Sequence, residues 1–282
     1  MKTIIAISLI LLSGLVGAQG SASADPFQGL VDIRKHAIES ESVGETYEFL
    51  VALPAGYAES PDRKYPTLYL TDGAALLPML LGYYRYLYFA EEVPEIIFVA
   101  LSYSDNDWTM GNNRSHDYSA PSVERDDYGG AADFQAMLRN EIMPLVEGQY
   151  RSRGDRRIVY GQSMGAQFVM YTAHTQPDLF WGHIASNPAM HRNVEFFLPD
   201  ATEISDQPVS RLFVGTAEND DPRFKVPTMQ WIEEWSGQPK KPWLLQVESL
   251  DGHNHFSAAP ASFRRGMKWL FSSATIPRPA GD

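Results

Sequence analysis

The sequence contains no cysteine among its 282 residues. A disulfide framework is therefore excluded, and so is a lipid anchor that is attached through a cysteine. Stability has to come from a packed core, and a chain of this length with 44% apolar residues can form one.

Positive charge is also scarce. The chain has 23 Lys and Arg residues against 35 Asp and Glu residues, and its formal net charge at pH 7 is −12. Binding to nucleic acid or to an anionic membrane requires many basic contacts, so neither is expected. An anionic substrate would need arginines placed locally.

Long apolar runs are missing except at the N-terminus, where Ile4–Val16 follows Lys2. This run is shorter than the roughly 20 residues of a membrane-spanning helix, and small residues follow it up to Ala18 and Ala24. We therefore interpret residues 1–24 as a secretory signal peptide that is cleaved after one of these alanines, the alternative being an uncleaved anchor. A bacterial exported protein, periplasmic or secreted, is expected.

After this leader no linker divides the chain. Residues 25–282 are expected to form one domain with a short frayed tail at 275–282. Strands are predicted at 47–53, 65–71, 96–101, 157–160, 183–186, 211–215 and 243–247, and helices at 75–90, 133–146, 164–174 and 261–271. This alternation predicts an α/β fold with a mostly parallel sheet and helices on both faces.

The sharpest local motif is Gly161-Gln162-Ser163-Met164-Gly165, which has an apolar strand before it and a helix after it. This context is that of the nucleophile elbow of α/β-hydrolases, where a strained turn presents a serine at the end of a strand. Only small residues two positions before and after the serine avoid a clash in that turn. The alternative is an ordinary turn bounded by glycines.

A serine hydroxyl needs a neighbouring base, which comes last along the chain in this fold. His253 and His255 follow the last predicted strand, and spacing alone does not separate them. The orienting carboxylate should follow the strand at 211–215, where Glu218, Asp220 and Asp221 are candidates. Glu218 is favoured because it is nearest to the end of the strand; the alternative is a solvated acidic loop.

Several segments together resemble the esterase family of α/β-hydrolases, which includes esterase D, enterobactin-type siderophore esterases, feruloyl and acetyl-xylan esterases and mycolyltransferases. The resemblance covers nearly all of the mature chain. It rests on the elbow and on Leu53–Tyr57, Tyr65–Gly73, Arg114, Asp117–Tyr118, His255–Ser257, Phe263–Gly266 and Trp269–Phe271. The last three segments are most similar to the exported siderophore-esterase branch.

This resemblance implies that His255 is the base. It also implies an oxyanion hole formed by the backbone N–H groups of Met164 and Ala74, which would stabilise the tetrahedral intermediate. The chain departs from the family at Asn187-Pro188, where many relatives have Ser-Pro, and this difference concerns the local wall of the pocket and not the chemistry.

Other residues have two interpretations each. Arg114 and Asp117 lie on a loop that borders the substrate pocket in relatives, and they either bind substrate or form an ion pair that anchors the loop. Two aromatic groups could contact an aryl substrate, although core packing is favoured for both. The first aromatic group consists of Tyr83, Tyr84, Tyr86, Tyr88 and Phe89, and the second consists of Trp231 and Trp235.

No cofactor and no metal is expected, because two histidines one residue apart, with Asp251, are a weak metal signature. We predict an exported serine carboxylic ester hydrolase that acts through an acyl-enzyme with a Ser-His-Glu triad, on a siderophore or aryl ester. A feruloyl or acetyl-xylan esterase, an acyltransferase and a non-catalytic binding protein are the alternatives. The substrate is a small-molecule or polysaccharide-linked ester; the oligomeric state is not predicted.

Overall fold

The computed structural model describes residues 32–103, 113–199 and 209–272. The predicted leader and the predicted C-terminal tail lie outside these ranges. Among the described residues no helix has the length and apolar character needed to cross a bilayer.

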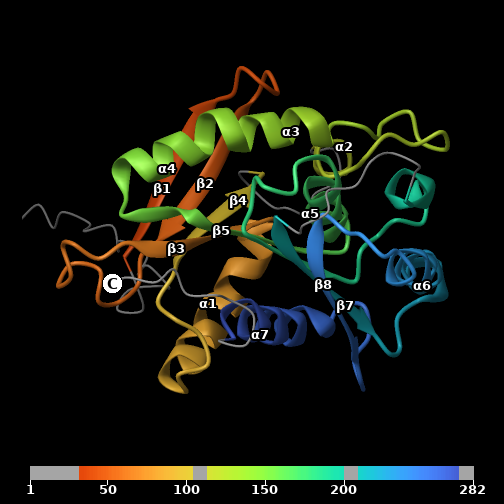
Figure 1. The fold of residues 1–282 in the computed structure, drawn as a ribbon. Coiled ribbons are helices and arrows are strands. Elements are labelled where there is room, and N and C mark those ends of the chain that lie inside the picture. Colours follow the sequence, from red (N-terminus) through yellow and green to blue (C-terminus); the bar gives the residue numbers. More distant parts are fainter. Residues whose placement is uncertain (1–31, 104–112, 200–208, 273–282) are drawn as a thin grey trace, which may run out of the picture.

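One eight-stranded sheet forms the centre of the molecule (Figure 1). Its spatial order is β1-β2-β4-β3-β5-β6-β7-β8, and all neighbours from β4 to β8 are parallel, whereas β1, β2 and β4 pair antiparallel. The strands are β1 (Ile33–Glu39), β2 (Thr46–Ala52), β3 (Tyr65–Leu70), β4 (Ile97–Ser102), β5 (Ser152–Gln162), β6 (Gly182–Ser186), β7 (Ser210–Ala217) and β8 (Trp243–Leu250). The predicted α/β-hydrolase fold is confirmed.

Helices cover both faces of the sheet (Figure 1). Leu68, Leu70 and Phe98 point to the face covered by α1 (Gly73–Phe89) and α7 (Ala258–Phe271), while Tyr69 and Val99 point to the other face. That second face is covered by α3 (Ala131–Met137), α4 (Met143–Gln149), α5 (Met164–Thr175) and α6 (Pro222–Ser236), and the short helix α2 (Arg114–Asp117) precedes them. Alternation of side chains along each strand thus produces two cores, one on each face.

The helix predicted at 133–146 is longer and is interrupted. A π-helical turn, Leu138–Ile142, joins α3 to α4, and Pro144 follows it. Because a proline has no N–H to donate to the carbonyl of Asn140 and its ring crowds that carbonyl, the helix widens there. The sequence did not predict β1, whose charged residues form a half-exposed edge strand, the helix α6, or the short helices at Arg114–Asp117 (α2) and Val194–Phe197.

The register of the parallel strands brings their carboxyl ends to one edge of the sheet. Gln162 of β5 pairs with Ser186 of β6, which pairs with Gly215 of β7, and Ala217 pairs with Leu250 of β8. The residues that follow these ends therefore meet at this edge, which is where open α/β sheets bind ligands.

Candidate active site

Ser163 occupies the sharp turn between β5 and α5, with φ 60° and ψ −116°. A Cβ added to Gly161 would lie 2.2 Å from the backbone carbonyl of Gly165, and a Cβ added to Gly165 would lie 2.2 Å from Thr71 Oγ1. Both distances are far below van der Waals contact. The turn therefore requires glycine at both positions, as the sequence predicts, and these contacts fix the strained serine.

Ser163, His255 and Asp220 form a continuous chain of hydrogen bonds. His255 Nε2 lies 2.9 Å from Ser163 Oγ, and its Nδ1 lies 2.9 Å from Asp220 Oδ1 and 3.2 Å from Oδ2. Because the carboxylate can only accept, the Nδ1–H donates to it and Nε2 is left to accept the serine hydroxyl proton. Both the imidazole and the carboxylate are buried, with side chains 9% and 2% exposed, so this interaction is little weakened by solvent.

Glu218 does not contact His255, and its expected position beside the histidine is wrong. Its side chain is exposed, and Oε2 accepts the backbone N–H of Gly252 at 2.8 Å. Nearness to the strand end did not select the carboxylate because the turn after Ala217 directs residue 218 outward and residue 220 inward. Asp221 also stays outside the cluster, where it caps α6 by accepting the N–H of Arg223 at 2.8 Å.

His253 lies away from the nucleophile. Its Nδ1 is 3.3 Å from Ser257 Oγ, and its carbonyl accepts the N–H of Asn219 at 2.9 Å. This second contact joins the loop that bears His255 to the loop that bears Asp220. The geometry therefore favours His255 over His253, in agreement with the register that the resemblance implies.

The two expected oxyanion donors begin helices that start beside the elbow. Met164 is the first residue of α5, and Ala74 is the second residue of α1. First-turn N–H groups have no acceptor within their own helix, so they remain free to bind an anion. The two turns touch, since a Cβ on Gly165 would lie 3.2 Å from Asp72 Oδ2.

A family model described as "Putative esterase" matches residues 40–269, which is most of the chain. The chain belongs to this esterase family. It is a serine hydrolase of the class that cleaves carboxylic esters.

This esterase is 22% identical to the ferri-bacillibactin esterase BesA of Bacillus subtilis (strain 168), over 82% of its own length and 87% of that protein. Among solved structures, the siderophore hydrolase EstB from Aspergillus nidulans superimposes with a TM-score of 0.72 at 18% identity, covering 87% of this chain and 97% of that chain. An IroE-like serine hydrolase from Shewanella oneidensis superimposes with a TM-score of 0.69 at 21% identity, covering 85% and 80%. At these identities, the structural likeness shows the fold.

Arg114 and Asp117 do not pair with each other in the esterase. Arg114 donates to both carboxylate oxygens of Asp72, from Nε at 2.5 Å and from a terminal nitrogen at 2.8 Å. Asp72 is fully buried, has a left-handed conformation (φ 53°) and immediately precedes the turn to Ala74. The loop is therefore anchored by an ion pair between Arg114 and Asp72, and not by the expected pair of Arg114 with Asp117, and this ion pair holds the loop of the expected oxyanion donor.

Asp117 has no exposed surface to offer a substrate. It accepts hydrogen bonds from the hydroxyl groups of Tyr47 and Tyr103, the latter at 2.8 Å. Burial raises the pKa of the Asp117 carboxyl, and the two tyrosine hydroxyls oppose that shift. Asp117 therefore stabilises the structure around α2 through these two tyrosines.

Sequence reasoning missed the aromatic ring beside the base. Phe224, at the start of α6, stacks on the His255 imidazole with ring centroids 4.3 Å apart and planes 23° apart. This stacking restricts rotation of the imidazole and covers one of its faces. No local pattern marks Phe224, and its contact arises only because α6 follows the acid loop directly.

The aromatic groups considered as aryl-binding sites lie elsewhere. Trp231 and Trp235 pack in the core with Trp243, with ring centroids 4.8 to 6.3 Å apart. At the end of α1, Tyr84 is buried, whereas Tyr86 and Phe89 are 75% and 64% exposed.

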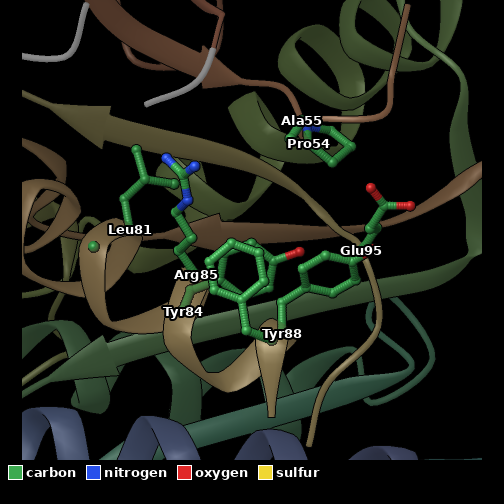
Figure 2. A pocket seen from close by; sticks show the side chains of 9 residues that line it. Pro54, Ala55, Leu81, Tyr84, Arg85, Tyr88 and Glu95 are labelled. Atoms are coloured by element: carbon green, nitrogen blue, oxygen red, sulfur yellow. The ribbon is translucent and has the colours of Figure 1, made fainter. Parts of the chain in front are cut away.

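An apolar pocket lies at this end of α1 (Figure 2). It is lined by Pro54, Ala55, Leu81, Gly82, Tyr84, Arg85, Tyr88, Phe89 and Glu95. Pro54 and Ala55 follow β2 and Glu95 precedes β4, so the pocket is at the edge where the parallel strands begin, opposite to Ser163. Its described lining contains no serine and no histidine.

Metal ligation finds no support in the described ranges, where no group of three or more His, Cys, Asp or Glu side chains could hold an ion.

Proposed function

We propose that the esterase cleaves its substrate through an acyl-enzyme, with Ser163 as nucleophile, His255 as general base and Asp220 as the carboxylate that orients the imidazole. The unbroken chain of contacts from hydroxyl to imidazole to carboxylate, with 2.9 Å on each side of the ring, carries this proposal. Asp220 replaces Glu218 in the role that the sequence had suggested.

In the first step, Ser163 Oγ attacks the ester carbonyl carbon while its proton passes to His255 Nε2. The tetrahedral oxyanion would be bound by the N–H groups of Met164 and Ala74. Its collapse breaks the bond to the alkoxy oxygen, which takes the proton from Nε2 and leaves as the alcohol. Water then attacks the acyl-enzyme, gives its proton to Nε2 and releases the carboxylic acid, and Ser163 recovers its proton.

The test is the hydrolysis of a short-chain p-nitrophenyl ester by purified variants. Ser163→Ala and His255→Ala should each lower kcat by about 10⁴-fold or more, because the triad acts as a unit. The matched controls are Ser236→Ala, on the exposed end of α6, and His253→Ala, which should both stay within about threefold of the parent enzyme. Full activity of Ser163→Ala would contradict the proposal.

We further propose a siderophore ester or lactone as the substrate. The relatives described above are an esterase and a hydrolase of siderophores. Arg192 would supply local positive charge near the nucleophile, because it influences Tyr128, whose hydroxyl lies 3.8 Å from Met164 Sδ. Burial raises the pKa of Tyr128; Arg125 and Arg192 oppose the rise, and Asp127 adds to it. Arg192 is partly exposed and lies 3.8 Å from its carboxylate neighbour Glu124, so it would offer positive charge to an anionic group in a chain that is otherwise acidic.

Turnover of an enterobactin-type trilactone, methyl ferulate and acetylated xylan should be compared at one ionic strength. The trilactone should give the highest kcat/KM. Arg192→Gln should raise KM for the trilactone but not for a neutral p-nitrophenyl ester. The control is Arg156→Gln, because Arg156 lies against Trp181. This control should change neither KM value. A preference for ferulate or xylan, or no turnover of any of the three, would reject the siderophore assignment.

Export is the remaining part of the proposal. N-terminal sequencing of the protein recovered from the periplasm or the medium of an expressing bacterium should begin at residue 19 or 25. Recovery from the cytosol with residues 1–24 intact would contradict it.

A further inference from the structure

Asn187 joins the loops that bear the base and the acid. It follows β6 directly and is 1% exposed, with φ 47°. Its Nδ2 donates to the backbone carbonyl of His255 at 3.1 Å, and its Oδ1 accepts the backbone N–H of Ala217, the last residue of β7, at 2.7 Å. Opposite partner types at the two ends of the carboxamide fix its orientation.

The backbone around Asn187 connects the same site to the nucleophile. Its own N–H donates to the carbonyl of Gly215 at 2.8 Å, and the preceding carbonyl, that of Ser186, accepts the N–H of Ser163 at 3.0 Å. Asn187 thus contacts β7, which leads to Asp220, and the loop that bears His255. The preceding residue, Ser186, accepts the N–H of Ser163 in the elbow.

Gln162 makes a similar contact but does not bridge. Its Nε2 donates to the same His255 carbonyl at 2.5 Å, while its Oε1 is buried and has no partner among the described residues. The His255 peptide therefore receives two amide donors, of which only that from Asn187 is tied at its other end to the strand that leads to Asp220.

We propose that Asn187 is a positioning residue that sets the His255 imidazole between Ser163 and Asp220. This inference rests on the proposed function. It requires a carboxamide at position 187: a carboxylate would still accept from Ala217 but could not donate to the His255 carbonyl, and it would place a negative charge against that oxygen. Without the hydrogen bond from Asn187 to the His255 carbonyl, the loop that bears His255 would shift relative to Ser163. A displacement near 1 Å is enough to lower the rate by about 100-fold.

Two variants separate the side-chain contacts from backbone strain. Asn187→Asp keeps the size of the side chain and removes the donor. Asn187→Gly removes both side-chain bonds and adopts the left-handed conformation without strain. Ser262→Ala is the matched control. Ser262 is fully buried, and its Oγ accepts a hydrogen bond at 2.8 Å from Oγ of Ser186, the neighbour of Asn187. Among the described residues its side chain has no hydrogen bond to the loops that bear His255 and Asp220.

Three properties are measured for each variant. The first is kcat and KM on a p-nitrophenyl ester, with kcat expressed per active site titrated with a fluorophosphonate. The others are the rate of fluorophosphonate labelling and the midpoint of thermal unfolding. Asn187→Asp and Asn187→Gly should lower kcat by about 10- to 100-fold with KM within about threefold, and slow labelling in parallel. Ser262→Ala should lower the thermal midpoint while kcat per titrated site stays unchanged.

Parent-like kcat per titrated site in both Asn187 variants would overturn the inference, even if both lose stability. If Asn187→Asp does not fold, Asn187→Gly alone decides the matter. Failure of the proposed function would look different, since Ser163→Ala would then retain activity whatever the Asn187 variants do.

Discussion

The two edges of the sheet differ in what they offer a ligand. The edge where the parallel strands begin has an apolar pocket at the end of α1, with exposed tyrosine and phenylalanine rings. The opposite edge has Asp72, Ser163 and Asn187, which follow β3, β5 and β6 and all have positive φ. Such backbone costs about 1–3 kcal/mol per residue and persists only where neighbours hold it. Glu91, just after the end of α1, also has a positive φ of 56°, so positive φ alone does not distinguish the edges. The reactive edge is marked by strained residues that lie within a polar network, and not by the apolar pocket.

The carboxylates give the largest expected contrast, because both lie in one turn at the reactive edge. Asp220→Asn should lower kcat by about 10³- to 10⁴-fold, since the amide no longer favours the imidazole with its proton on Nδ1. Glu218→Gln should stay within about threefold, because that exposed side chain accepts a hydrogen bond from the backbone of Gly252 and not from His255. Steady-state kinetics on the same ester checks both, and equal losses would show that the loop is not arranged as described.

This pair also shows what the sequence could and could not predict. The strand, elbow and helix around Ser163 could be predicted because glycine spacing and apolar periodicity are local. The choice of Asp220 could not, because it depends on the loop conformation set by the contact of Asn219 with His253. The role of Asn187 was also beyond sequence reasoning, since its partners are 30 and 68 residues away.

Glycines give the next contrast between the two edges. Gly161→Ala would place a Cβ 2.2 Å from backbone atoms of Gly165, so we expect a loss of about 3 kcal/mol or more in the free energy of unfolding, together with loss of activity. Gly82→Ala, in α1 beside the pocket, would meet nothing within 4 Å and should stabilise the protein by about 0.5–1 kcal/mol with activity unchanged. Denaturant titrations and ester kinetics measure both; a tolerated Gly161→Ala would contradict the close approach.

Two buried histidines on the elements that bear the reactive edge predict an acid limit to stability. Burial lowers the pKa of His174 in α5 to about 4 and that of His183 in β6 to about 3. Unfolded histidines bind protons below about pH 6.5, so stability should fall as pH decreases from there towards 4, by up to about 3 kcal/mol for His174. Denaturant unfolding between pH 7 and 4 measures this loss.

His183→Leu is the variant that checks the origin of this loss. This variant has one histidine fewer to protonate on unfolding. The pH slope of its free energy of unfolding should therefore be smaller by the equivalent of about one proton. An unchanged slope would assign the acid sensitivity to other groups.

Variants of the α1 pocket should have the smallest effect. Tyr88→Ala and Phe89→Ala change side chains that are 37% and 64% exposed, and each should alter kcat/KM by less than about twofold. A large change in kcat/KM would connect this edge to catalysis and remove the distinction between the two edges.

The most direct measurement is the mass-spectrometric location of a fluorophosphonate adduct on the folded protein. The account predicts one adduct, on the peptide that contains Ser163, formed far more slowly in His255→Ala. An adduct on a different serine, or undiminished ester hydrolysis by protein that forms no adduct, would contradict it.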